Sequence, residues 1–488
     1  MSTTPGKQGL ATAGWVGSAR AFIAPLALAQ FICSFAGSNM NVMINDISRD
    51  LNTDVKGVQT CITLFLLIMA VLMIPCSKLT DKWGRKRCFL GGLILYGVGA
   101  LLSAVAPGLG ILILGNSIFE GVGTAFLIPP VYILTTMAFT SLESRAKAFG
   151  VISGLGGIGA AAGPLIGGLI TSAISWRAAF VFQAIVIVVI IVLGRRVADP
   201  VAADPKLPFD LAGAVLSGVG MFCIVLGILQ ADTNATLFVV FVAIGLAFLA
   251  GFFLYIRSRE RTGKAALLSL DLFKNRTSNL GMITQNLQWM LLMGVSFVVS
   301  VFLQTERHYS AIKTGVIFTA ATVGVLVSSL AAERLANRRE QRTLIAGGFV
   351  GTGVGIGLLL ALVHASSSSP WAFAPGLLLI GLGLGVMLTP SVNIVQGAFP
   401  EDKQGEISGL SRSISNLGSS FGTAIAGTIL VSNLASGNGT YVAAMVVLIA
   451  VAVAGFGIAS RLPANPRKAA SSDPAQPAAA AGTLNTTA

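Results

Sequence analysis

The chain has 488 residues, of which 54% are hydrophobic and only 10% are charged, and its net charge is +13. Soluble domains carry about 25% charged residues, so this composition, with a mean hydropathy of +0.82, excludes a water-soluble protein and indicates an integral membrane protein. The positive charges lie in short loops between apolar runs, which fits an anionic membrane surface better than a nucleic acid.

Fourteen apolar runs follow one another along the chain, and each approaches the roughly 20 residues that a spanning helix needs. The first run lacks the layout of a cleavable signal, so we expect it to be an uncleaved span. The sequence therefore predicts an all-α integral membrane fold with helices that begin near Ala21, Gly57, Phe89, Leu109, Lys147, Arg177, Leu211, Leu237, Ser278, Ile312, Leu344, Trp371, Gly405 and Tyr441.

The cations are distributed unevenly between the two sides of this layout. Of the 32 Lys and Arg residues, all but Arg49, Lys56, Arg177, Arg307 and Lys313 fall on the side of the N-terminus. Because cytoplasmic loops are enriched in Lys and Arg, we expect a multi-pass protein of the plasma (inner) membrane with both termini in the cytoplasm.

An internal repeat divides the chain. The pattern G-x-I-S-G-L occurs at 150–155 and again at 405–410, an offset of 255, which also pairs Gly163 with Gly418 and Gly167 with Gly422. Repeated halves around a central site are typical of transporters. The predicted division is a cytoplasmic tail (1–20), a six-helix bundle (21–196), two inserted central spans with their loops (197–276), a second six-helix bundle (277–461) and a disordered tail rich in Ala, Pro and Ser (462–488).

The loop at 77–89 carries five cations and one anion, Asp81. Gly84 suits the positive φ of a tight turn between two helices. For Lys78, Lys82 and Lys86 the simpler interpretation is a loop that only sets the orientation of the chain.

The same loop resembles the G-x-L-A-D-R-x-G-R-K signature of the major facilitator superfamily. Leu79 matches, whereas Ser77 and Thr80 stand where the family usually has glycine and alanine. The resemblance implies a latch between the cytoplasmic ends of the two halves, formed by Asp81, Gly84, Arg85 and Lys86 with Arg145 as a possible partner.

The fifth run contains the stretch GAAAGPLIGG at 159–168. Small residues on successive turns permit close helix packing, and a proline bends the helix. The pattern is also similar to the antiporter signature of the same superfamily, which implies export, and segments 209–213 and 267–273 look like those of its 14-span drug:proton antiporters. The signature residues are Gly159, Gly163, Pro164, Gly167 and Gly168.

The fourth run carries Asn116 and Glu120 on one helical face. Glu120 lies about 16 Å along the span, near the membrane midplane. A carboxylate there is costly unless it faces a wet cavity, pairs or stays protonated. We expect Glu120 to couple protons or bind a cation, although a protonated glutamate that only joins two helices is an open alternative.

Two proton-handling residues of the antiporter pattern are absent, and Glu120 itself stands where the pattern usually has a glutamine. Ala36 stands where the first span of the family usually has an aspartate, and Ser117 where the fourth has an arginine. Asp46, nearer the outer end, is a weak substitute, so proton coupling would depend on Glu120.

Polar residues also recur at helical spacing in three other runs. They either line a cavity or form hydrogen bonds between helices, and both interpretations stay open. Such a cavity would be polar and nearly free of fixed charge, which suits an amphipathic or cationic solute. The cavity candidates are Gln30, Ser34, Ser38 and Asn41 in the first run, Gln285 and Trp289 in the ninth, and Thr389, Asn393 and Gln396 in the twelfth.

The leading prediction is a monomeric secondary exporter that exchanges drugs or other amphipathic or cationic small molecules for protons by alternating access. The alternative is an exporter or flippase of a lipid or native metabolite, with Glu120 binding the substrate. The sequence has no phosphate-binding G-x-x-x-x-G-K-[ST] loop for ATP. With two histidines and no nucleophile–base constellation, it favours no enzyme, no metal site and no cofactor.

Overall fold

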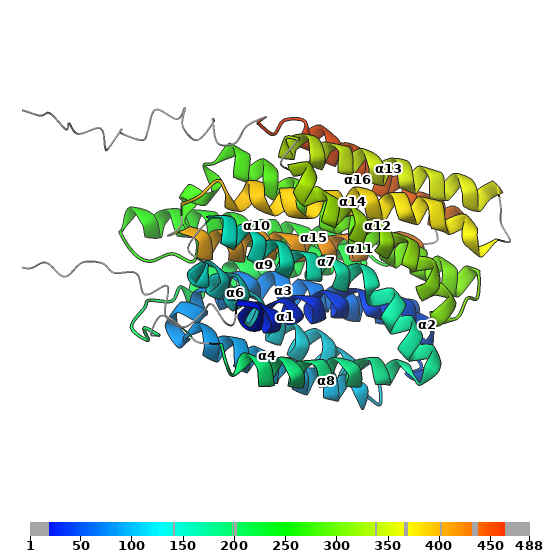
Figure 1. Cartoon of the computed structure of the whole chain (residues 1–488), viewed down its shortest axis with the longest axis horizontal. Helices are drawn as coiled ribbons and strands as arrows, with labels where there is room; N and C mark the ends of the chain where they lie inside the picture. Colours follow the sequence, from blue (N-terminus) through cyan, green and yellow to red (C-terminus); the bar gives the residue numbers. More distant parts are fainter. Residues whose placement is uncertain are drawn as a thin grey trace, which may run out of the picture.

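The computed structural model describes residues 19–139, 142–197, 199, 203–336, 339–365, 369–400, 403–431 and 438–463, which form helices and loops. The helices lie side by side along one direction (Figure 1). We call the end where α1 begins and α16 ends, at the left of Figure 1, the near end, and the opposite end the far end. The first part of the chain forms α1 (Ala19–Asn39), η1 (Met40–Met43), α2 (Ile44–Asp50), α3 (Val55–Trp83), α4 (Arg85–Ala104), α5 (Leu109–Leu112), the π-helix η2 (Ile113–Glu120), α6 (Gly121–Ala138), α7 (Leu142–Ala173) and α8 (Trp176–Gly194).

The remaining helices continue the same arrangement. They begin close to the positions expected from the hydropathy of the chain. They are α9 (Leu211–Gln230), α10 (Ala235–Arg261), η3 (Leu270–Phe273), α11 (Arg276–Val301), the π-helix η4 (Phe302–Glu306), α12 (Ala311–Ala336), α13 (Gln341–Ala365), η5 (Pro370–Phe373), α14 (Ala374–Gln396), α15 (Gln404–Val431) and α16 (Asn438–Ala459).

Thirteen helical segments of the described chain are long and apolar enough to cross a membrane. The fourteenth, α15, has 28 residues but is rich in serine, and Ser411, Ser415 and Ser419 are buried along it. Because α3 and α11 cover α15, it needs no continuous apolar surface toward lipid. The predicted all-α membrane fold is confirmed.

Local sequence signals explain where the helices begin. Asp54 Oδ1 accepts a hydrogen bond from the N–H of Gly57 at 2.7 Å, and Asp210 Oδ1 accepts one from Gly213 at 3.0 Å. Each carboxylate satisfies a backbone donor that the first helical turn leaves unpaired. Gly84 has a φ of 94° between α3 and α4, as the turn prediction required.

The contacts between helices follow the internal repeat. α7 packs against α1 and α12, and α15, its counterpart in the repeat, packs against α11 and α3. Asn41 Nδ2 donates to Ser296 Oγ at 3.0 Å, and these two residues are themselves 255 positions apart. Two related groups of helices therefore face each other. The boundaries at 21–196, 197–276 and 277–461 stay a prediction, and the predicted tails lie almost wholly outside the described residues.

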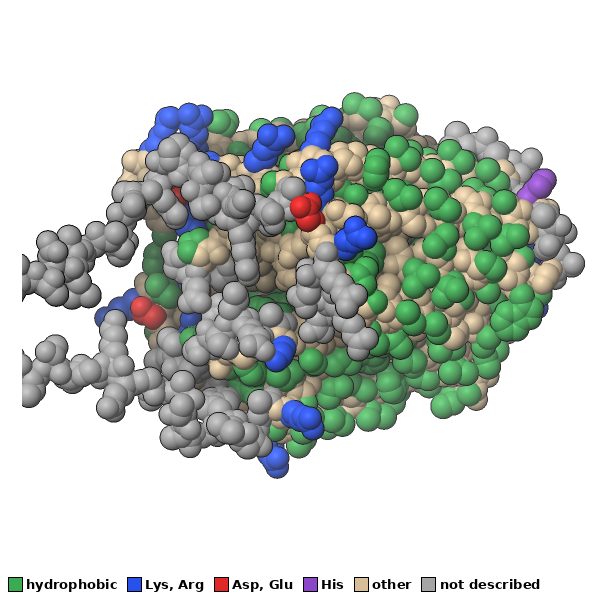
Figure 2. Space-filling view, turned by 45° about the horizontal axis from the view of Figure 1, so that its top comes forward, with side chains coloured by type: hydrophobic (Ala, Val, Ile, Leu, Met, Phe, Trp, Pro, Cys, Tyr) green, Lys and Arg blue, Asp and Glu red, His purple; other side chains and the backbone are tan. Residues whose placement is uncertain are grey.

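The surface separates charge from apolar area. Figure 2 shows Lys and Arg side chains gathered toward the near end and a broad hydrophobic surface over the rest of that face. In α10 only 11% of the most apolar stretch is buried within the protein, so this helix presents most of its surface outward, as a lipid-facing helix does.

Candidate functional site

A cavity of about 40 Å³ lies between the two groups of helices, walled by α1, α3, α6, α11 and α15. We call it the central cavity. Gln30 and Ser34 of α1 and Asn416 of α15 form part of its polar wall, and Trp289 of α11 and Met73 of α3 form part of its apolar wall. The predicted combination of polar and aromatic lining is present here.

Hydrogen bonds connect the two groups of helices between this cavity and the far end of the molecule. Gln304 Nε2 donates to the carbonyl oxygen of Asn41 at 2.7 Å, and Asn45 Nδ2 donates to the carbonyl oxygen of Gln304 at 2.7 Å. The N–H of Ile312 donates to Ser172 Oγ at 2.9 Å. Each bond joins the first group of helices to the second.

The near end is closed by a different set of contacts. Ser77 Oγ of α3 donates to the carbonyl oxygen of Gly405 at 3.2 Å. Next to it, Lys78 forms an ion pair with Glu406 of α15, whose Oε2 also accepts from the N–H of Ser269 at 3.4 Å. Contacts between the two groups of helices are therefore present at both ends of the central cavity.

Two further ion pairs at the near end share Asp271, and one of them connects η3 to the loop before α15. Asp271 pairs with Lys274 and Lys403 at 2.9 and 3.1 Å, and hydrogen bonds from these two cations lower the pKa of its carboxyl group. Its contribution to stability is therefore present above the unfolded-state pKa and is lost only as the pH falls through the lowered folded-state value. This contact does not switch near neutral pH.

Arg412 of α15 lies in the wall of the central cavity and is 9% exposed. It donates to the Tyr132 hydroxyl, and its guanidinium carbon lies 4.4 Å from the centre of the Tyr132 ring. Tyr132 Oη in turn donates to Gln30 Oε1 at 3.1 Å. The sequence predicts a cavity nearly free of fixed charge, and Arg412 is the one charged side chain among the described residues that line it.

Glu120 is fully buried at the end of the π-helix η2. Asn116 Nδ2 donates to its Oε2 at 3.4 Å, and Tyr96 of α4 lies next to the carboxyl group. The helices approach closely at this point, because a Cβ on Gly99 of α4 would lie 2.6 Å from the carbonyl oxygen of Gly115. Glu120 thus sits between η2 and α4.

The carboxyl group of Glu120 lies behind the wall of the central cavity. Cys33 belongs to that wall, and on its other side it lies against Thr124 and within electrostatic reach of Glu120. Glu120 itself is not among the lining residues. In this conformation a thin layer of side chains therefore separates the predicted coupling residue from the cavity.

The other predicted residues of the first span lie nearer the far end. Ser38 is fully buried where α1 meets α7, and a Cβ on Gly163 would lie 2.0 Å from its Oγ. Asn41 takes part in the far-end closure. Asp46 lies farther out and lines a separate cavity of about 500 Å³ at the far end with Arg49.

The predicted residues of the ninth and twelfth spans divide between several places. Trp289 lines the central cavity, whereas Gln285 accepts from Ser411 Oγ at 2.8 Å. In α14, Gln396 Nε2 donates to Ser408 Oγ at 3.4 Å, Thr389 is partly buried and Asn393 is exposed. The stripe on α14 does not belong to the central cavity wall.

The small residues of α7 give close approaches to two helices. A Cβ on Gly159 would lie 2.4 Å from the carbonyl oxygen of Phe31 in α1, and one on Gly167 would lie 3.1 Å from Asn39 Cβ. Gly168 faces the other group of helices, since its Cβ would lie 2.4 Å from the carbonyl oxygen of Ala311. α12 approaches α7 equally closely at Pro164, because a Cβ on Gly315 of α12 would lie 2.6 Å from the carbonyl oxygen of Pro164.

The charged loop between α3 and α4 makes local contacts. Asp81 pairs with Arg85 at 2.6 Å, and Lys86 Nζ donates to the carbonyl oxygen of Arg195 at 2.7 Å. The side chain of Arg145, the predicted partner of Asp81, lies outside the described part of the chain. Sequence reasoning missed the contact between the two groups of helices at this end, which Lys78 makes.

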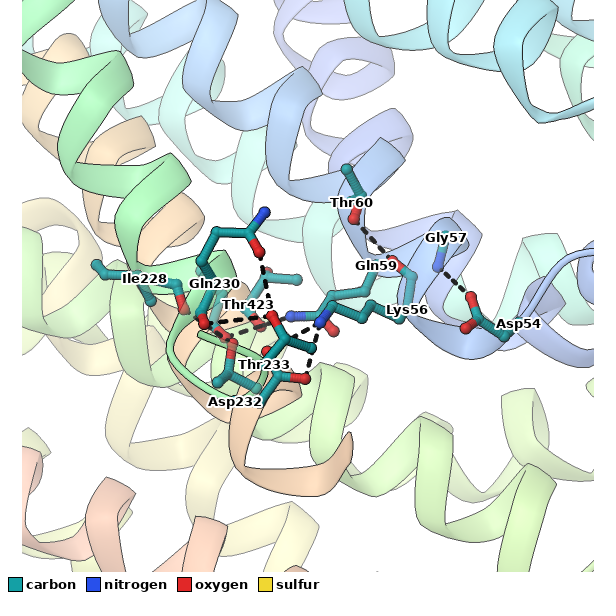
Figure 3. Close-up of polar contacts among 12 residues, drawn as sticks. Asp54, Lys56, Gly57, Gln59, Thr60, Ile228, Gln230, Asp232, Thr233 and Thr423 are labelled. Carbon is teal, nitrogen blue, oxygen red and sulfur yellow. Dashed lines mark hydrogen bonds and ion pairs between the residues drawn. The ribbon is translucent and has the colours of Figure 1, made fainter. Parts of the chain in front are cut away.

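The end of α9 and the loop that follows it attach to both groups of helices at the far end. Figure 3 shows Lys56 of α3 pointing to Asp232 in the loop between α9 and α10, 2.8 Å away. Thr428 Oγ1 of α15 donates to the carbonyl oxygen of Ile228 at 3.2 Å. Gln59 of α3 completes the junction by donating to the carbonyl oxygen of Ala424 at 3.3 Å.

Comparison with known proteins identifies relatives over most of the chain. Residues 26–270 and 281–485 match the family described as the Major Facilitator Superfamily. The puromycin resistance protein pur8 of Streptomyces alboniger is 29% identical over 82% of this chain and 80% of its own length. The multidrug efflux pump LfrA of Mycolicibacterium smegmatis is 26% identical over 87% of this chain and 82% of its own.

Two further proteins extend the comparison. The riboflavin transporter RibZ of Clostridioides difficile is 24% identical over 84% of this chain and 88% of its own length. A crystal structure of a peptide transporter POT in complex with alafosfalin superposes with a TM-score of 0.64, covering 93% of this chain and 96% of that one at 15% identity. This likeness establishes the fold alone.

Proposed function

This chain belongs to the Major Facilitator Superfamily, a family of transporters rather than enzymes, and is related to drug efflux pumps; we propose that it exports drugs or other amphipathic small molecules in exchange for protons. The observation that carries this proposal is a cavity that lies between two related groups of helices, with contacts between the groups at each end. Rocking of two repeats about a central site is the mechanism by which such transporters alternate access.

The near end is the cytoplasmic end in this proposal, because the cations gather there and positive loops stay inside. Opening to the cytoplasm must break the ion pair between Lys78 and Glu406. We therefore assign the latch function to this pair, while Asp81 and Arg85 stabilise the adjoining turn. The far-end contacts of Asn45 with Gln304 form the opposite gate.

Glu120 is the proposed proton carrier. Its Oε1 has no hydrogen-bond partner among the described residues, and no Lys or Arg of that part of the chain forms an ion pair with it. A buried carboxylate without an ion-pair partner costs several kcal/mol or more, so we infer that the group carries a proton in this conformation. Movement of Cys33 and Thr124 would open it to the cavity.

Transport in proteoliposomes tests the proton assignment. The unmodified protein should drive uphill efflux of a dye when a pH gradient is applied. Glu120→Gln should abolish the uphill component but leave downhill counterflow, because the neutral side chain fits the site without exchanging a proton. Glu340→Gln makes the same change at an exposed position and should behave like the unmodified protein. Uphill efflux by Glu120→Gln would refute the assignment.

One observation favours the alternative of a lipid cargo. An apolar groove of about 560 Å³ opens between α3, α6 and α9, lined by residues such as Phe126, Phe209 and Phe222. A membrane-dissolved molecule could enter the protein from this side. Counterflow of a fluorescent phospholipid that is independent of the pH gradient would support this function over proton-coupled drug export.

A further inference from the structure

We propose that the central cavity recognises an anionic group on its cargo and that Arg412 is the residue that binds it. This inference rests on the proposed export function and narrows it to amphipathic organic anions and zwitterions. It departs from the expectation of a cationic cargo.

The argument begins with the charge balance of the cavity. Arg412 is the charged residue in the cavity wall, and within the described part of the chain it forms no ion pair with a carboxylate. Its recorded partner is the neutral Tyr132, through the hydroxyl and the ring. A buried cation without a counter-ion is costly. A bound anion would supply that missing charge.

The neighbouring side chains complete a site for an amphipathic molecule. Asn416 and Ser419 follow Arg412 at i+4 and i+7, so all three face the cavity from one side of α15. A guanidinium and nearby amide and hydroxyl donors suit a planar carboxylate. Trp289 and Met69 provide apolar contact for the body of the cargo.

The position of Arg412 links binding to opening. Tyr132 belongs to α6 and Arg412 to α15, so their contact joins the two groups of helices. Opening of the near end separates them and frees guanidinium donors. The cavity of about 40 Å³ also has to widen before it can hold a drug-sized molecule. An anion from the near side then replaces the tyrosine hydroxyl.

The test compares two dyes that differ in one charge. Rhodamine B carries a free carboxylate, and its ethyl ester, rhodamine 3B, is a cation with the same ring system and the same diethylamino groups. Binding to the purified full chain is measured by fluorescence polarisation and efflux by proteoliposome transport. The unmodified protein should bind rhodamine B about tenfold or more tightly than the ester, as expected for a charged hydrogen-bonded pair.

Variants separate recognition from folding. Arg412→Gln should lose the preference between the dyes, and Arg412→Lys should retain part of it because the charge remains. Arg461→Gln removes a cation at an exposed position and should leave the preference unchanged. Tyr132→Phe should keep or strengthen the preference, since the guanidinium loses a competing partner.

Three outcomes count against the inference. Export of rhodamine 3B by the unmodified protein with no preference for rhodamine B would retain the exporter function and remove the anion site. An unchanged preference in a correctly folded Arg412→Gln variant would also remove it. Transport of neither dye by the unmodified protein would count against both the anion site and drug export.

Discussion

Gly168 offers the sharpest perturbation of the far-end closure. Its Cβ position lies 2.4 Å from the carbonyl oxygen of Ala311, a backbone atom of the opposing group of helices. Ordinary contacts are about 3.5 Å, so Gly168→Ala forces α7 and α12 apart by about 1 Å. Overpacking of this kind costs about 1–3 kcal/mol. This cost raises the free energy only of conformations in which the far end is closed. We expect the open population there to rise about 5- to 150-fold.

Distance measurements between spin labels would detect this shift. Ile174→Cys and Trp371→Cys place labels on exposed positions at the far ends of the two groups, after Cys223 is replaced by serine. Gly154→Ala is the matched control, because it lies on the same helix and a Cβ there has no neighbour within 4 Å. A longer distance population should appear for Gly168→Ala alone. Identical distributions for the two variants would refute the close-approach argument.

The remaining predictions concern the near end. Lys78→Glu or Glu406→Lys alone should favour cytoplasmic opening by about 1 kcal/mol, as expected for a partly exposed ion pair. The double variant with both charges reversed should restore the distances between spin labels at the near end. A double variant that stays open would argue against the latch. Asp81→Asn removes the carboxylate that accepts from Arg85 Nη2, the guanidinium nitrogen of Arg85 that has a hydrogen-bond partner among the described residues. Transport should therefore fall while membrane insertion, measured by surface labelling, stays normal, and unchanged transport would exclude a role for Asp81.

The sequence predicts the fold because the apolar runs and the positive loops each carry an independent signal. α15 is the instructive case, since its serines lower its hydropathy below that of the other helices. The repeated G-x-I-S-G-L pattern still identifies it as the counterpart of α7. Its polarity follows from its place between other helices, which a hydropathy profile does not report.

The site was harder to predict because its residues come from distant parts of the chain. The charge distribution along the sequence groups Arg412 with the cations at the cytoplasmic end, just inside its span, whereas it lies about 12 Å along α15 at 1.5 Å per residue. The distance of Arg412 from the start of its span was the feature of the sequence that could have indicated a place inside the membrane. Glu120 was correctly expected to be buried, but the π-helix before it changes the side-chain register and turns its carboxyl group toward α4. The contact between Lys78 and Glu406, 328 residues apart, has no local signature.

The most direct test of alternating access measures the distances at both ends of the molecule, in proteins that carry no substitution other than those needed for labelling. Labels at Arg87 and Glu340, both exposed at the near end, complement the far-end pair at Ile174 and Trp371. Reciprocal change is expected, with one distance lengthening as the other shortens when substrate or pH is varied. Simultaneous lengthening at both ends would contradict the account, because it would describe a continuous pore.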